Sequence, residues 1–318
     1  MPINRVQFQR GMSMSEFMSC YGTDQQCAEA LFKARWPDGF RCPRCVHAGC
    51  WRVRQDQRTL MQCCACRHQC SLTAGTVMDS TKLPLRIWFL AIYLLSQAKT
   101  GLSALALSRQ LGVTYRTAWL VHHKLMHAMA QADALKPLQG DVQIDDAYLG
   151  GECPGKATGR GSPNKVPIVA AVALSPQGHP LRTKFTPIKG FTSDAIRDWA
   201  RSHLAPGCDV RSDGLSCFAG VIDAGCAHSY IVVGDRKPRD LPQFRWVNTV
   251  LGNLKTAISG AYKAFKFAKY AHSYLGAFSY RFNHRFDLHG LVLALCTTVA
   301  VGSPVHEWQI RGQAELAA

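Results

Sequence analysis

Two aspartates, an asparagine and a lysine occupy positions suited to phosphate chemistry. Asp145 lies in a strand-like run, 142–149, and Asp213 ends a second short run. Asn248 follows Asp213 after 34 intervening residues, and Lys255 follows seven residues later, which is two turns of a helix. Oxygen ligands of this kind suit a pair of Mg²⁺ or Mn²⁺ ions that cut and join phosphodiesters. The sequence therefore predicts a two-metal site on Asp145, Asp213 and Asn248. Lys255 is expected to meet a phosphate.

Two neighbouring residues are alternatives in this site. Asp146 competes with Asp145 for the first position. Asn253 is a rival third ligand, but it lies further from Asp213 and too close to Lys255 to share its helix face. An amide in the third place offers a carbonyl oxygen without charge, so we expect weaker binding of the metal ion that it contacts.

Short strands and helices alternate after residue 137 in an order that would gather these side chains. The predicted strands are 141–149, 167–174, 181–187, 209–212 and 228–233, with helices at 192–203 and 214–224 and a long helix from about Asn248. This is the ribonuclease-H-like order, in which the first strand, the end of the fourth and the final helix converge. We therefore expect a ribonuclease-H-like α/β catalytic domain with a mixed five-stranded sheet.

Cysteines are concentrated towards the N-terminus. Nine of the fourteen lie between residues 20 and 70, which in a cytosolic protein favours metal binding over disulfides. The pairs Cys42/Cys45 and Cys63/Cys66 are both CxxC and are separated by 17 residues, as in zinc ribbons. The sequence predicts one structural Zn²⁺ on these four thiolates. The alternative pair with Cys64 is a cramped C-x-C, and the possible substitutes His47, Cys50, His68 and Cys70 have no better spacing.

Two segments are candidate DNA contacts. Arginines surround the cysteine turns, and the stretch 102–119 predicts a helix, a turn at Gly112 and a second helix capped by Thr114. In a helix-turn-helix the start of the second helix touches base edges. The net charge is +16, and residues 1–137 hold 17 Lys/Arg against 7 Asp/Glu, which favours a nucleic-acid partner. The predicted DNA-binding residues are Arg41, Arg44, Arg52, Arg54, Tyr115, Arg116 and Thr117.

The chain as a whole is predicted to be an α+β multidomain protein. Its longest apolar run, 87–95, is too short to span a bilayer, and residues 1–10 are polar, so we expect a bacterial cytoplasmic, nucleoid-associated protein with no membrane partner. The predicted parts are an N-terminal helical segment (1–35), a zinc ribbon (36–76), a helix-turn-helix region (77–135), the catalytic domain (138–300) and a tail (301–318).

Several of these motifs together resemble one family, over nearly the whole chain. They are RWPDGF (35–40), CPRC (42–45), TAGT (73–76), IDDAYLGG (144–151), WVNT (246–249) with Lys255, and YRFNHR (280–285). The chain is similar in these motifs to insertion-sequence transposases of the zinc-ribbon DDE group, the ISXO2-like transposases, some of which have Asn as the third residue.

The resemblance implies a metal-dependent reaction on double-stranded DNA. Water would cleave one strand at a transposon end, and the new 3′-hydroxyl would then attack target DNA. Synapsis of two ends implies a homo-oligomer, a dimer or a tetramer. Two alternatives stay open: a non-enzymatic DNA-binding protein derived from a transposase, and a ribonuclease-H-like nuclease that cuts without joining.

Overall fold

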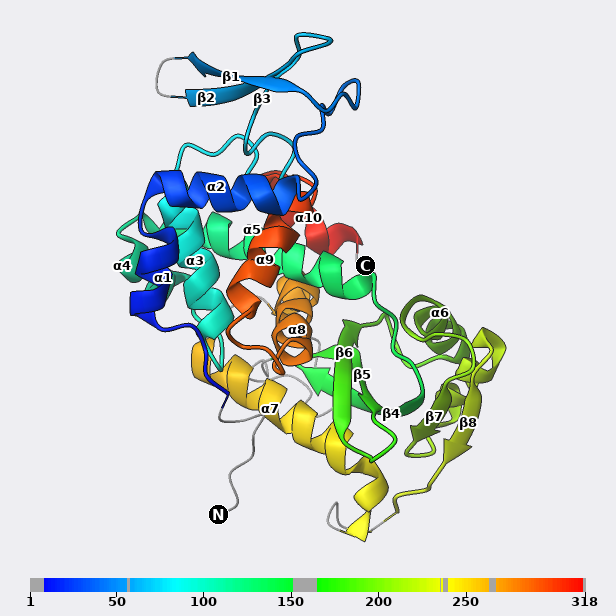
Figure 1. Ribbon diagram of the computed structural model, residues 1–318. Coiled ribbons are helices and arrows are strands. Elements are labelled where there is room, and N and C mark those ends of the chain that lie inside the picture. Colours follow the sequence, from blue (N-terminus) through cyan, green and yellow to red (C-terminus); the bar gives the residue numbers. More distant parts are fainter. Residues whose placement is uncertain are drawn as a thin grey trace. The chain divides into compact units, whose positions relative to one another are not determined.

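The computed structural model describes residues 9–55, 58–150, 165–234, 236, 240–262 and 267–316 (Figure 1). The chain divides into two compact units. Unit 1 comprises Met1–Ala98, Ala104–Ala128 and Phe286–His306, and unit 2 comprises Lys99–Ser103, Met129–Arg285 and Glu307–Ala318. Among the described helices, none is both long and apolar enough to cross a membrane.

Unit 1 combines helices with a small antiparallel sheet. Its first two helices each begin with a capping box, at Ser13 and Thr23, so local sequence fixes where they start. The sheet has the order β1-β2-β3. The elements are α1 (Met14–Tyr21), α2 (Asp24–Arg35), β1 (Cys50–Gln55), β2 (Arg58–Cys63), β3 (Gln69–Ser71), α3 (Leu85–Gln97), α4 (Ala104–Leu111), the first part of α5 (Tyr115–Ala134), and α9 (Leu291–Val301).

Arg35, at the end of α2, fastens the small sheet to that helix. Its guanidinium donates to the carbonyls of Ser71 and Leu72, at 3.1 and 2.7 Å, and to that of Ala74. The same group lies 4.5 Å above the ring of Trp36. The RWPDGF and TAGT motifs thus meet through Arg35. The small core beneath the sheet consists of Trp36, Phe40, Cys42, Met61, Cys63 and Cys70.

Unit 2 is built on a mixed five-stranded sheet of order β6-β5-β4-β7-β8. The first three strands in sequence are antiparallel neighbours, whereas β7 and β8 run parallel to β4. Their bounds are β4 (Asp141–Leu149), β5 (Val166–Leu174), β6 (Pro180–Pro187), β7 (Asp209–Ser212) and β8 (Ala227–Tyr230). This is the ribonuclease-H-like arrangement, so the predicted fold class is confirmed.

Helices cover both faces of this sheet (Figure 1). Val142 and Ile144 of β4 pack with α6 and η2, whereas Ala147 and Leu149 pack with α7 and α8. Because side chains alternate along a strand, Asp145 belongs to the face covered by α7. The helical elements are α6 (Ser193–His203), the 3₁₀ helices η2 (Ser216–Ala224) and η4 (Pro242–Phe244), α7 (Arg245–Ala261), α8 (Phe267–Asn283) and α10 (Glu307–Leu316).

Three element boundaries near the site differ from the predicted ones. The helix expected at 214–224 is a 3₁₀ helix that begins at Ser216. The strand expected to reach residue 233 ends at Tyr230, because its partner β7 stops at Ser212 and Gly214, with φ of +93°, turns the chain away. The long helix begins at Arg245 rather than at Asn248, because η4 leads directly into it.

The C-terminal segment also differs from its predicted organisation. Helix α9 packs on α2 and α3 in unit 1, whereas the sequence had assigned residues up to 300 to the catalytic domain. Helix α10 occupies most of the segment 301–318, for which only a tail was predicted. The pattern of α9 is apolar all round, so its sequence does not indicate which elements it packs against.

A buried charged network joins the last turn of α5 to the sheet of unit 2. The Asp133 carboxylate accepts hydrogen bonds from Arg182 at 3.0 Å and from the Asn283 amide at 2.7 Å. The ammonium of Lys184 donates to the Asp133 backbone carbonyl at 2.8 Å. The Asn283 carbonyl oxygen in turn accepts the N–H of Thr183 at 2.7 Å. Asn283 of the YRFNHR motif therefore has an architectural role within unit 2, fixing α8 and the residue Asp133 to β6.

Candidate metal centres and nucleic-acid interface

Three carboxylates gather between the middle of β4 and the end of β7. The oxygens of Asp145, Asp146 and Asp213 lie within 4.8 Å of one another, and all three residues are half-buried. The register of the two strands explains why Asp145 and Asp213 are close. The parallel strands β4 and β7 pair Gln143 with Arg211. Two residues further along the chain, Asp145 therefore comes opposite Asp213 on the same face of the sheet.

Asp146 joins this cluster although neighbouring residues of a strand point to opposite faces. The ladder between β4 and β7 covers only Asp141–Gln143 and Asp209–Arg211. No β7 residue therefore pairs with Asp145 or Asp146, and both carboxylates reach the space beside Asp213. The sequence predicts Asp146 only as an alternative to Asp145, but the structure places both of them in the cluster.

Helix α7 is tied to the same strand by a side chain that sequence analysis missed. Gln143 is only 3% exposed, and its carbonyl oxygen accepts the backbone N–H of Val247 at 3.0 Å. Gln143 lies two residues before Asp145, on the same face of β4. Its signal in the sequence is an amide between the apolar residues Val142 and Ile144. The bond holds the start of α7, and so the segment that carries Asn248, against β4.

Asn248 and Lys255 lie on one side of α7, and Asn253 lies on another. Both predicted residues are exposed, and the charge of Lys255 acts on the Asp145 carboxyl. At about 100° per residue, Asn248 lies within about 20° of Lys255, whereas Asn253 is about 160° away from it. The angular positions around α7 therefore favour Asn248 over Asn253 as a neighbour of the aspartates. The role of Asn248 as a metal ligand stays a prediction.

The electrostatics of the cluster fit a cation. Burial, with the negative charges of Asp213 and Asp146, raises the pKa of Asp145 to about 7, against the opposite effect of Lys255. Half-buried carboxylates that repel one another are stabilised by a divalent cation, and oxygen donors are those that Mg²⁺ and Mn²⁺ prefer. The three side chains present therefore fit such an ion.

Replacing Asp145 with Asn should stabilise the protein when no magnesium or manganese is added. The folded-state pKa is above the ordinary value, so ionisation of Asp145 costs stability as pH rises from about 4 to 7. We expect Asp145→Asn to be more stable than wild type by about 2–4 kcal/mol at pH 8, with the gain disappearing near pH 4. Urea unfolding at both pH values measures this, and equal stability at pH 8 would contradict it.

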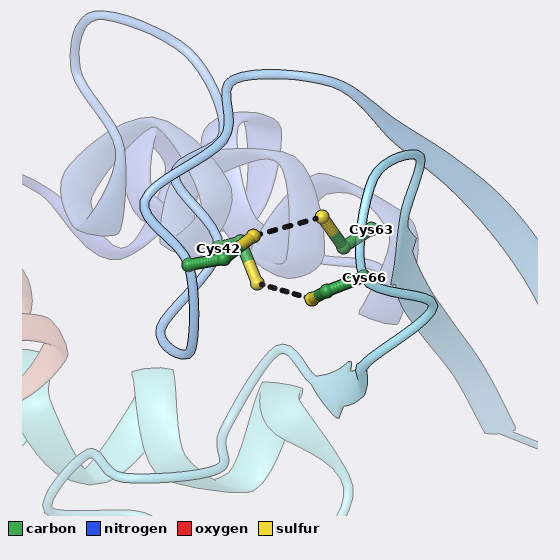
Figure 2. A group of neighbouring side chains, drawn as sticks. Cys42, Cys63 and Cys66 are labelled. Atoms are coloured by element: carbon green, nitrogen blue, oxygen red, sulfur yellow. Dashed lines mark hydrogen bonds between the residues drawn. The ribbon is translucent and has the colours of Figure 1, made fainter.

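The four predicted zinc ligands form a second cluster, in unit 1. The sulfurs of Cys42, Cys45, Cys63 and Cys66 lie within 4.8 Å of one another, with Cys42 3.6 Å from Cys66 and Cys45 3.5 Å from Cys63. The two turns face each other in Figure 2. Tetrahedral zinc–thiolate bonds would set sulfurs about 3.8 Å apart. Hydrogen bonds from the backbone N–H groups of Cys66 and Ala65 and from the neighbouring thiols lower the pKa of Cys63 to about 6. Against the effect of the His47 backbone, hydrogen bonds with Cys66 and Cys63 raise the pKa of Cys45 to about 12.

The exposed residues predicted to contact DNA belong to two parts of unit 1. Arg41, Arg44 and Arg54 are exposed on the ribbon, as is Arg52, whose guanidinium lies 5.8 Å from the Phe32 ring. Helices α4 and α5 flank a turn at Gly112, whose φ is +65°. At the start of α5, Tyr115 and Arg116 are exposed. Thr117 is half-buried, and its hydroxyl bonds that of the cap residue Thr114 at 2.9 Å. The Thr117 hydroxyl therefore takes part in capping the helix.

A ribonuclease-H-like sheet with aspartates clustered beside its first strand and at the end of its fourth is compatible with a DDE-type transposase. Comparison with known proteins narrows this class. Residues 137–283 match the model of the ISXO2-like transposase domain, and residues 22–69 match that of the transposase zinc-ribbon domain. The chain belongs to this family of insertion-sequence transposases. It is also 27% identical, over 234 residues, to a protein of Halobacterium salinarum named "Uncharacterized protein in transposable element ISH50", covering 67% of this chain and 75% of that protein.

Proposed function

We propose that this transposase binds the terminal inverted repeats of its element as double-stranded DNA. It cleaves each end by metal-dependent hydrolysis and joins the resulting 3′-hydroxyl to target DNA. The observation that carries the proposal is the group of carboxylates on Asp145, Asp146 and Asp213, within 4.8 Å, on a ribonuclease-H-like sheet. The transposase and zinc-ribbon domain matches support the same reading.

The side chains of the site have separate roles in this proposal. Asp145 and Asp213 would hold Mg²⁺ or Mn²⁺, with Asn248 as third ligand and Asp146 beside them. Bound there, the two ions supply Lewis-acid stabilisation of the attacking and leaving oxygens. The ammonium of Lys255 meets a DNA phosphate and fixes the strand along α7. Because Asn248 brings no charge, the negative charge that the protein itself offers to the cations would come from the carboxylates alone.

Unit 1 provides the DNA-binding surfaces in this proposal. A Zn²⁺ ion on the four cysteines would hold the ribbon, which presents Arg41, Arg44, Arg52 and Arg54 to phosphates. Tyr115 and Arg116 at the start of α5 would touch base edges. Two DNA ends must be brought together before joining, so the active form is a dimer or a tetramer bound to DNA in the bacterial nucleoid.

An assay with labelled end DNA, target plasmid and Mg²⁺ distinguishes the three candidate functions. Joined products support the transposase, and end binding without any chemistry supports a DNA-binding derivative. Cutting without joining supports a nuclease. We expect nicked ends first and joined products later.

Replacing Asn248 should identify the third ligand. We expect Asn248→Ala to slow joining about 10- to 100-fold, whereas Asn248→Asp and Asn248→Glu retain more activity because they restore an oxygen ligand. Asn253→Ala is the matched control on the same helix and should join at the wild-type rate. Wild-type joining by Asn248→Ala would exclude Asn248 from the site.

A further inference from the structure

Arg211 lies on the same face of the sheet as the aspartate cluster, two residues before Asp213. The ladder between β4 and β7 pairs it with Gln143, whose side chain lies against the start of α7. Val210, its neighbour in β7, is instead buried among the residues that pack with α6. Because side chains alternate along a strand, Arg211 shares its face with Asp213, and this face is the one that carries Asp145.

The sheet is uncovered around Arg211. Helices α7 and α8 pack mainly on β4, β5 and β6. The residues of β7 and β8 that belong to the same face are all exposed, namely Asp209, Arg211, Ala227 and Ser229. The ladder between β7 and β8 pairs Arg211 with Ser229, so a hydroxyl accompanies the guanidinium. These two side chains, here called the Arg211 shelf, form an open polar surface next to the row that carries Asp213.

The Arg211 guanidinium has no ion pair or hydrogen bond to any residue that the structure describes. Asp209 and Asp213 precede and follow it by two residues on the same face, but neither carboxylate pairs with it. The Asp213 carboxylate instead accepts the backbone N–H of Leu215 at 3.2 Å. A guanidinium presents five N–H donors in a fixed fork that fits two phosphate oxygens. In the described part of the chain, the donors of Arg211 are therefore available to a ligand.

An anionic ligand explains a positive charge in this place. The aspartate cluster is suited to divalent cations, and a nearby guanidinium repels such ions unless an anion lies between them. A DNA strand whose scissile phosphate lies at the cluster brings further phosphates beside it, one for each nucleotide. The Arg211 shelf adjoins the cluster along β7, so one of these neighbouring phosphates comes within reach of the guanidinium.

We infer that Arg211 is a substrate-binding residue whose guanidinium holds a DNA phosphate next to the scissile one, with the Ser229 hydroxyl as a second donor. The inference rests on the proposed function and deepens it, because it names a contact that sets which phosphodiester lies at Asp145 and Asp213. Paired N–H bonds from Arg211 to the two non-bridging oxygens fix that phosphate in position and orientation. Arg211 takes no part in the bond changes themselves.

The test combines Arg211→Ala with end DNA in which single phosphates near the cleavage site are replaced by uncharged methylphosphonates. Binding to the full chain is measured with Ca²⁺ in place of Mg²⁺. At one position next to the scissile phosphate, the replacement should weaken binding by wild type about five- to ten-fold. The same replacement should not weaken binding by Arg211→Ala any further, because the contact is already lost.

Two further readouts follow the same contact. The slope of log K against log salt should be smaller by about one in Arg211→Ala, as expected when one phosphate contact is removed. In Mg²⁺ and at sub-saturating DNA, Arg211→Ala should cleave about ten-fold more slowly than wild type. Arg211→Lys keeps the charge without the planar fork, so its rate should lie between the two.

Arg201→Ala is the matched control, because Arg201 is an exposed arginine on α6, which covers the other face of the sheet. It should respond to every methylphosphonate as wild type does. The inference is overturned if each methylphosphonate weakens Arg211→Ala as much as wild type, or if Arg201→Ala shows the same loss of response. A wild-type protein that binds ends but neither cuts nor joins them in Mg²⁺ would defeat the proposed function, whereas the binding comparison in Ca²⁺ would still report the phosphate contact.

Discussion

Asp145→Ala and Asp213→Ala are each expected to reduce end cleavage and end joining by at least about 10³-fold while leaving end binding intact. Asp145 lies in β4, Asp213 directly follows the parallel strand β7, and their carboxylate oxygens lie within 4.8 Å of each other. Removing either one takes away a ligand that both chemical steps need, so cleavage and joining should fall together. Gel-shift and strand-transfer assays on the same preparations measure binding and chemistry separately.

The same two strands offer matched controls. Asp141 and Asp209 are exposed aspartates at the opposite ends of β4 and β7, and the register pairs them with each other. Asp141→Ala and Asp209→Ala remove equal charge from the same strands without touching the cluster. Both should cleave and join at the wild-type rate. Losses as large as those of Asp145→Ala would instead indicate that any change in these strands disturbs the fold.

Removing the metal from the ribbon is expected to unfold it. Its core consists of six residues, two of which are the candidate ligands Cys42 and Cys63. Structural zinc contributes about 10–16 kcal/mol in isolated zinc-finger peptides, far more than so small a core provides. We therefore expect Cys63→Ser to lose bound zinc and to lose hydrogen-exchange protection across β1, β2 and β3, while β4 to β8 stay protected.

Cys64 provides the control for this prediction, because it is the next residue in the chain, is exposed and lies outside the cluster. Cys64→Ser should retain one zinc per chain by elemental analysis and keep the protection of wild type. The ribbon assignment would be wrong if Cys63→Ser kept its zinc, or if both serine variants lost it equally.

The residues that carry strong local signals were predictable from the sequence. Asp145 lies in one strand and Asp213 directly follows another, and the order of elements brings those two strands together, so the proximity of the two aspartates follows from topology. The CxxC spacing likewise forces sulfurs into two tight turns, and the four sulfurs converge as expected. For the aspartates and for the cysteines, the local sequence pattern and the position of the residues in the fold agree, and such agreement makes a prediction from sequence reliable.

Other parts of the site depend on features that local patterns do not encode. Alternation along β4 predicts that Asp146 turns away from Asp213, yet its carboxylate lies in the cluster, at a level of β4 beyond the last residue of β4 paired with β7. Gln143 resembles any polar residue in a strand until α7 is packed beside it. Helix α9 is apolar on all sides, so its place in unit 1 follows from packing against α2 and α3 and not from its sequence.

The central claim is that metal ions held by Asp145 and Asp213 act directly on the scissile phosphodiester. Replacing the leaving 3′-oxygen of the end DNA with sulfur tests it most directly, because sulfur binds Mn²⁺ better than Mg²⁺. We predict that wild type fails to cleave this substrate in Mg²⁺ and regains cleavage in Mn²⁺, with no rescue in Asp213→Ala. Equal loss of cleavage in both metals, or cleavage by wild type with neither metal present, would contradict the account.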